Sequence, residues 1–162
     1  MRDPSPPAAI EIPERFNLAD WLLDERLREG RGGEVALRLP DRDVTYDAVA
    51  ALSRRYANVL AGLGLRPEER VFLMLPDGPD FVGSLFGALR AGGVVVMLNP
   101  ELHADAIAAL VDYLRPRFSV IDGRLAHTWA EALGTSQERT QLLTVGDRAP
   151  GCPAFEELSR TV

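Results

Sequence analysis

The alternation of apolar runs and helical patterns in the second half of the chain most constrains its fold. Val71–Leu75 is a continuous apolar run, typical of a strand that is covered on both faces. The strands predicted by such runs are Val71–Leu75, Val94–Leu98, Phe118–Ile121 and Gln141–Val145, and the helices between them are Pro79–Ala91, Ala104–Leu114 and Leu125–Leu133. Strands that alternate with helices at this spacing indicate a parallel sheet with right-handed crossovers. The predicted fold class is α/β, a layered parallel sheet flanked by helices.

The first half of the chain carries different signals. Residues 1–16 hold four prolines and predict an extended leader before a domain at 17–162. Asn17 is placed to cap a helix over Leu18–Glu29, which Gly30 ends. The runs on either side of Pro40–Asp43, Val35–Leu39 and Val44–Tyr46, predict a short antiparallel hairpin that precedes the parallel sheet. Thr45 then caps a long helix that stops at Gly64.

The spacing of apolar residues also predicts which side chains each helix buries. The expected inward residues are Leu18, Trp21, Leu22 and Leu27 in the first helix; Val49, Leu52, Tyr56, Leu60 and Leu63 in the second; and Phe81, Val82, Leu85, Phe86 and Leu89 in the third. At the far end, Phe155–Leu158 starts a helical pattern with nothing apparent to pack against. This predicts that 17–162 is an incomplete subdomain of a truncated protein.

Composition and charge exclude several classes of protein. Of 162 residues, 46% are hydrophobic and 26% charged, which is ordinary for a globular chain, and no apolar run approaches the roughly 20 residues that span a membrane. The net charge is -6 without a basic stretch, so nucleic-acid binding is disfavoured. The start lacks a secretory signal and Cys152 is the only cysteine, which together predict a cytoplasmic location.

All 18 basic residues are arginine, so chemistry that needs a lysine has no residue here to perform it. The best candidate for a phosphate loop is the strand-to-helix turn Leu75–Pro79, because ligands of an open parallel sheet bind beyond the carboxyl ends of its strands. This turn has a single glycine, Pro79 lacks an N–H, and Asp77 and Asp80 would repel phosphate. The turn is therefore interpreted as a helix start.

The remaining candidates are also given structural interpretations. The glycine clusters Gly30–Gly33 and Gly92–Gly93 follow helices, so they are expected to be C-caps. In Gly83–Gly87 the serine, Ser84, is misplaced for a nucleophile elbow and lies within a predicted helix. His103 and His127 have no neighbours at metal-ligand spacing, and Cys152 has no basic neighbour that would activate it. We therefore predict no catalytic, cofactor-binding or metal-binding residue in this chain.

Several stretches taken together resemble the N-terminal part of adenylate-forming acyl-CoA synthetases, and most closely the benzoate-CoA ligase and 2-aminobenzoate-CoA ligase branch. They are Ile12–Asp20, Glu29–Gly32, Val35–Arg38, Thr45–Val49, Pro67–Val71, Leu75–Phe81, Gly87–Gly92 and Val96–Pro100. The likeness extends from Ile12 to Ile121. It departs from the family at Ala48, where a glutamate is usual, at Met97 and around His103.

The resemblance implies a parent enzyme that converts an aryl carboxylic acid, ATP and CoA into acyl-CoA, AMP and pyrophosphate. In that family the phosphate loop, the lysines and the ribose-binding aspartate lie downstream of this region, so none of their roles transfers to a residue here. The resemblance therefore implies a scaffold that is inactive alone and takes no cofactor itself, whereas the complete parent uses ATP, Mg and CoA. Its expected partner is the downstream half of the synthetase or a second copy of itself, with no nucleic acid and no membrane.

Two other hypotheses remain open at this point. The chain could be a non-catalytic interaction module that self-associates or pairs with a larger synthetase. It could also be a complete doubly wound nucleotide-binding protein, which would require a phosphate loop that the sequence does not show.

Overall fold

The computed structural model describes residues 13–14, 16–136, 139–147 and 150–160. Four parallel strands form its central sheet, in the spatial order β4-β3-β5-β6. They are β3 (Arg70–Met74), β4 (Val94–Met97), β5 (Phe118–Asp122) and β6 (Gln141–Val145). The pairing is continuous, with Phe72 opposite Val96 on one side of β3 and opposite Ser119 on the other. The parallel sheet predicted from the sequence is confirmed, with strand ends within one residue of those expected.

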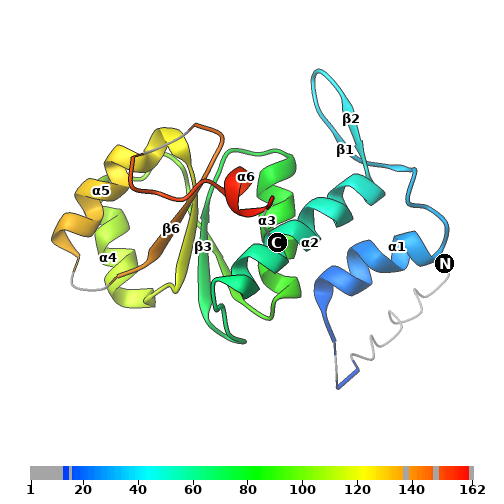
Figure 1. Cartoon of the computed structure of the whole chain (residues 1–162), viewed down its shortest axis with the longest axis horizontal. Coiled ribbons are helices and arrows are strands. Elements are labelled where there is room, and N and C mark those ends of the chain that lie inside the picture. Colours follow the sequence, from blue (N-terminus) through cyan, green and yellow to red (C-terminus); the bar gives the residue numbers. More distant parts are fainter. Residues whose placement is uncertain (1–12, 15, 137–138, 148–149, 161–162) are drawn as a thin grey trace, which may run out of the picture.

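Helices cover both faces of this sheet (Figure 1). One face is covered by α4 (Ala104–Leu114) and α5 (Ala126–Thr135), which follows the short 3-10 turn η2 (Gly123–Leu125). The other is covered by α2 (Tyr46–Gly62) and α3 (Pro79–Arg90), beside which lies α6 (Phe155–Leu158). Each face has its own buried apolar core, centred on Phe72, Ile107 and Trp129 on the α4 side and on Tyr56, Leu73 and Val120 on the α2 side. None of the helices in the described part is long and apolar enough to cross a membrane.

The N-terminal elements pack outside α2 and α3, away from the sheet (Figure 1). They are the π-helical turn η1 (Asp20–Asp24), α1 (Glu25–Arg28) and the antiparallel pair β1 (Val35–Arg38) and β2 (Asp43–Thr45). Asn17 and Thr45 accept backbone N–H bonds at the starts of their helices, as expected. The predicted leader at 1–16 lies almost entirely outside the described residues.

The predicted inward face of the first helix is wrong. Leu18, Trp21 and Leu22 are exposed, whereas Ala19 and Leu23 are buried, with Leu27 packed beside them. The helix carries two apolar stripes, and the tertiary structure selects the one next to Asp24. That carboxylate contacts Arg54 of α2 and Arg90 of α3, so Leu23 turns with it toward these helices.

The helix predicted at Pro79–Ala91 is confirmed as α3, but the residues predicted to be its most buried ones are wrong. The fully buried residues are the small ones, Gly83, Ser84, Gly87 and Ala88, whereas the bulky residues are only partly buried. A Cβ on Gly83 would lie 2.6 Å from Cγ of Leu52, and one on Gly87 would meet Cβ of Tyr56. The small residues therefore allow α3 to approach α2 closely.

The expectation that Phe155–Leu158 has nothing to pack against is also wrong. Phe155 is 3% exposed, and its ring stacks on that of Tyr56 at 3.6 Å between centroids. The segment before it bridges to β6, where the Thr144 N–H donates to the Pro153 carbonyl at 3.0 Å. The end of the described chain is part of the core on the α2 side.

Candidate functional site

A cleft of about 450 Å³ lies at the carboxyl ends of β3, β5 and β6. Its walls are the segments that follow these strands, Leu75–Asp80, Asp122 with Arg124, and Val145–Asp147. The chain passes from β3 outward to β4 and then returns to β5 on the other side of β3. The cleft therefore occupies the switch point at which open parallel sheets bind ligands.

Acidic side chains dominate this cleft. Asp77, Asp80, Asp122 and Asp147 line it, against a single basic residue, Arg124. The guanidinium of Arg124 donates to both carboxylate oxygens of Asp122, from Nη2 at 2.6 Å and from Nε at 3.0 Å and 3.1 Å, and these bonds hold the pKa of the Asp122 carboxyl below its ordinary value. Because Arg124 is already paired, the cleft presents net negative charge to any ligand.

Some backbone donors around the cleft are missing or already bonded. Pro76 and Pro79 have no N–H, and the Gly146 N–H donates to the Glu156 carboxylate at 3.1 Å. The Arg124 N–H is likewise bonded to Asp122 at 2.9 Å. A triphosphate needs several convergent donors or cations. That this chain binds neither ATP nor its magnesium complex by itself stays a prediction. In the residues that the structure describes, no cluster of three His, Cys, Asp or Glu side chains could hold a metal.

A buried phenol supports one wall of the cleft. The hydroxyl of Tyr56 donates to Asp80 at 3.1 Å, while its ring lies under Phe155. Burial raises the pKa of Tyr56, and the nearby charge of Asp80 raises it further. Tyr56 therefore remains a neutral donor that orients Asp80, and it cannot serve as a base at physiological pH.

The other candidate residues lie apart from the cleft or have structural roles. His103, which precedes α4, and His127 of α5 are exposed, and Cys152 is half-buried outside any disulfide. Ser84 is buried inside α3 and donates to the Phe81 carbonyl at 3.0 Å. Gly30 and Gly92 follow helices with φ of 76° and 82°, as expected of C-caps. The absence of catalytic residues from this chain stays a prediction.

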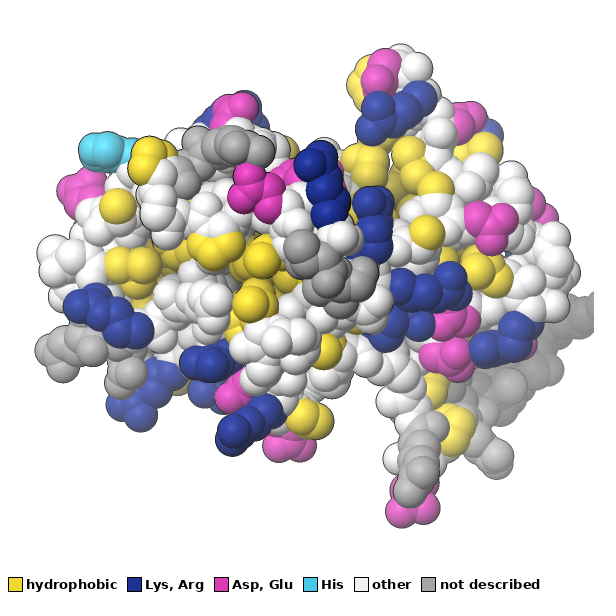
Figure 2. All heavy atoms as spheres, in the orientation of Figure 1, with side chains coloured by type: hydrophobic (Ala, Val, Ile, Leu, Met, Phe, Trp, Pro, Cys, Tyr) yellow, Lys and Arg dark blue, Asp and Glu magenta, His cyan; other side chains and the backbone are white. Residues whose placement is uncertain are grey.

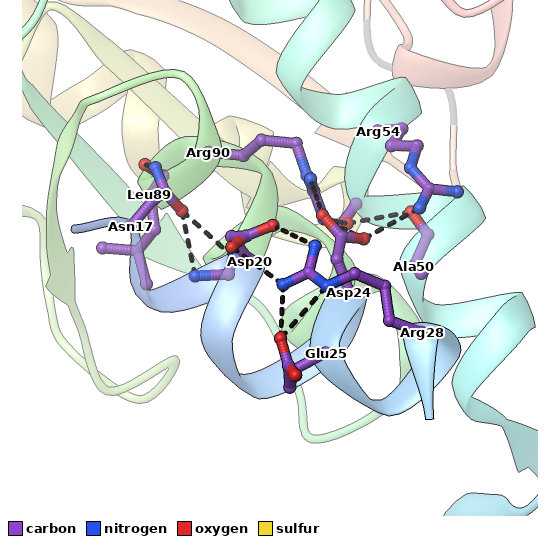
Figure 3. A network of polar contacts seen from close by, with 11 residues as sticks. Asn17, Asp20, Asp24, Glu25, Arg28, Ala50, Arg54, Leu89 and Arg90 are labelled. Atoms are coloured by element: carbon purple, nitrogen blue, oxygen red, sulfur yellow. Dashed lines mark hydrogen bonds and ion pairs between the residues drawn. The ribbon is translucent and has the colours of Figure 1, made fainter. Parts of the chain in front are cut away.

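The N-terminal helix carries a separate network of ion pairs, shown in Figure 3. Asp24 lies between Arg54 and Arg90, at 2.8 Å and 2.5 Å, and only 16% of its side chain is exposed. The Asn17 amide donates to the Leu89 carbonyl at 2.9 Å. The hydrogen bond from Arg90 is the main cause that lowers the pKa of Asp24. This network joins three helices, so we assign it a structural role.

Charges elsewhere are mixed. On the face shown in Figure 2, several basic side chains gather near the middle, with acidic side chains beside them. That nucleic acid is a poor ligand, as the net charge of -6 suggests, stays a prediction.

The turn Leu75–Pro79, considered from the sequence as a phosphate loop and interpreted as a helix start, forms one wall of the cleft, and the other two walls were not predicted. Asp122 and Asp147 each follow a predicted strand by one or two residues, and this position was the available signal. The strand order places β5 beside β3 and β6 beside β5, so the segments that follow these strands lie close to the turn at Asp77. The sequence alone does not give this order.

The amino-acid sequence is similar to those of several known proteins. A family model described as AMP-binding enzyme matches residues 23–159. The benzoate–CoA ligase of Thauera aromatica is 33% identical over 141 residues, which make up 86% of this chain and 27% of the ligase. The 4-hydroxybenzoate–CoA/benzoate–CoA ligase of Rhodopseudomonas palustris is 33% identical over 82% of this chain and 24% of its own length.

The fold is also similar to that of solved structures. A benzoate CoA ligase from Burkholderia xenovorans LB400 superimposes with a TM-score of 0.79 at 31% identity, over 91% of this chain and 29% of that one. The anthranilate CoA ligase AuaEII, in complex with anthranoyl-AMP, gives a TM-score of 0.84 at 25% identity, over 93% and 29%. The chain thus spans about a quarter of the length of the curated relatives that it matches.

Proposed function

Because the chain belongs to the AMP-binding enzyme family, we propose that it is the N-terminal scaffold portion of an ATP-dependent CoA ligase for aryl acids such as benzoate. The observation that carries the proposal is the 33% identity to benzoate–CoA ligase along 86% of this chain. The expected reaction of the whole enzyme joins the acid to AMP with release of pyrophosphate, and the CoA thiol then displaces AMP. ATP, Mg and CoA are therefore the expected cofactors of the whole enzyme, and a cytoplasmic location stays a prediction.

We infer that this chain positions the catalytic half and does not bind the nucleotide itself. The acidic cleft supports this inference, because Asp77, Asp80, Asp122 and Asp147 surround the place where a phosphate would otherwise sit. Charge-assisted hydrogen bonds contribute about 1.5–3 kcal/mol each, so a site that lacks three of them binds about a thousandfold more weakly or worse. The groups that hold ATP and magnesium must come from polypeptide outside these residues.

The test combines calorimetry with pyrophosphate exchange. The chain is titrated with ATP and magnesium, with and without benzoate, and exchange is then measured before and after addition of the C-terminal three-quarters of a benzoate–CoA ligase. We expect no saturable heat at micromolar ATP, and acid-dependent exchange only in the mixture. Saturable binding by the chain alone would contradict the proposal.

A matched pair of variants strengthens this experiment. Phe155→Ala removes the ring that packs on Tyr56 below the cleft, whereas Tyr113→Ala removes a side chain that is 84% exposed on α4. If the chain acts as a scaffold, the first variant should reduce the reconstituted exchange and the second should leave it unchanged.

The alternative is a non-catalytic interaction module. Its supporting observation is the group of exposed apolar side chains at Phe16, Leu18, Trp21 and Leu22, where the rings of Phe16 and Trp21 lie 5.7 Å apart. Such groups mark contact surfaces in many proteins. Failure of every ligase fragment to restore exchange, together with stable binding to one of them, would favour the module.

A further inference from the structure

The two edges of the parallel sheet differ. On the β6 edge, Thr144 pairs with Ala154 and its N–H donates to Pro153, so the chain itself covers part of that edge. On the other edge, β4 pairs only with β3 among the strands of the described residues. An unpaired edge strand is a ready template for another strand.

The backbone groups of β4 that point away from β3 can be assigned from the bonds between the two strands. The N–H of Val94 donates to Glu69 at 2.9 Å, and the N–H of Leu98 donates to Leu73 at 2.8 Å. Because N–H and C=O groups alternate between the two sides of a strand, those of Val95 and Met97 point to the outer edge. No backbone bond from a loop or turn in the described part of the chain reaches these two N–H groups.

The side chains and charge of this edge suit a second strand of the same kind. Val94 is 46% exposed and Met97 is 60% exposed, so the edge shows apolar side chains to solvent. No charged residue occurs from Ala91 to Pro100, and β4 contains no proline. Proteins usually protect an edge with lysine, proline or a bulge, and β4 carries none of these.

We propose that β4 pairs antiparallel with β4 of a second copy of this chain, around a two-fold axis at Val96. In this arrangement Val95 of each copy exchanges both backbone bonds with Met97 of the other, so all the outward groups of the two residues are paired. A register centred on Val95 would instead place Met97 opposite Gly93, whose N–H already donates to Ala88 at 2.8 Å. The bonding of Gly93 therefore favours the axis at Val96.

A second copy fits this edge better than a charged partner would. Two uncharged strands can approach across a two-fold axis without like-charge repulsion, and valine is among the residues most favourable for cross-strand pairing. The partial cover at Thr144 limits growth from the far edges, so a closed dimer with a continuous sheet is expected. This inference goes beyond the proposed function and does not depend on it.

Disulfide trapping tests the register. Val96→Cys in a Cys152→Ser background places the two thiols in a directly opposed pair whose Cα atoms are about 4.5 Å apart, which a disulfide can bridge. The matched control is Tyr113→Cys in the same background, because Tyr113 is far more exposed and lies on α4. We expect cross-linked dimer to form about tenfold faster or more at position 96. Equal or faster cross-linking at position 113 would overturn the proposal.

Sedimentation tests the strand pairing without a thiol. Met97→Pro removes one outward N–H while every bond to β3 remains, and Met97→Ala removes the same exposed side chain but keeps the N–H. We expect the unaltered chain to dimerise between about 1 and 500 µM, and Met97→Pro to raise the dimer Kd about tenfold or more above that of Met97→Ala. A chain that is monomeric throughout, or a dimer that both variants weaken equally, would overturn the proposal.

Discussion

Two helical segments pack on α2, and different forces hold them there. The small residues Gly83 and Gly87 bring α3 so close that no additional carbon fits between the helices. The N-terminal helix buries only Ala19 and Leu23 fully, and it is tied to α2 and α3 by the ion pairs of Asp24.

Because different forces hold these two contacts, they should respond differently to changes in side-chain volume and in pH. A close-packed contact between helices depends on shape, so it should be sensitive to volume and indifferent to pH. A contact built on a carboxylate between two arginines should be sensitive to charge and pH. We therefore expect a larger loss of stability from added volume at the close-packed contact than from loss of charge at the ion-paired one.

The largest effect is expected at the close-packed contact. Gly87→Ala would place a Cβ against Tyr56 and 2.9 Å from the carbonyl oxygen of Ser53, so α2 and α3 must separate. We expect a loss of about 3 kcal/mol in the free energy of unfolding, measured by urea denaturation. Gly62→Ala is the matched control, because nothing lies within 4 Å of its Cβ, and it should be neutral or stabilising by up to about 1 kcal/mol. Similar losses in both variants would contradict a steric origin.

A smaller effect is expected at the charged contact. Asp24→Asn leaves the guanidinium of Arg90 without its carboxylate and should reduce the free energy of unfolding by about 2 kcal/mol near neutral pH. The pKa of Asp24 is lowered in the folded state, so its stabilisation is present above the unfolded pKa of about 3.9. It is lost as the pH falls through the folded pKa.

Urea denaturation at a series of pH values checks this sign. The stability difference between the unaltered chain and Asp24→Asn should be largest above about pH 5 and should shrink toward zero below pH 4 or so. A difference that stays constant with pH would show that the aspartate stabilises by shape instead of charge.

The smallest effect is expected on the outer side of the same helix. Trp21→Ala removes a side chain that is 49% exposed and contacts the ring of Phe16. We expect a change within about 0.5 kcal/mol, whereas Leu23→Ala, at a residue that is 3% exposed, should cost about 2 kcal/mol or more. A larger loss of stability in Trp21→Ala than in Leu23→Ala would contradict this and would support the inward face predicted from the apolar spacing.

The sequence predicted the elements well because the signals for them are local. The apolar run at Val71–Leu75, the cap at Thr45 and the turn at Pro40–Asp43 depend on residues a few positions apart. The candidate site was only partly predicted. The turn at Asp77 follows from its position after a strand, but its proximity to Asp122 and Asp147 depends on strand order, which no local pattern encodes.

The α/β class, the parallel strands and the likeness to acyl-CoA synthetases follow from the amino-acid sequence alone, because periodicity and motif order are properties of the chain. The packed structure was needed to show which stripe of the first helix is buried, that Phe155 stacks on Tyr56, and that four aspartates meet in one cleft. Each of these depends on partners that are about 25 to 100 positions apart in the chain. Such contacts form only when the elements pack, since burial and ion pairing depend on distance in space and not along the sequence.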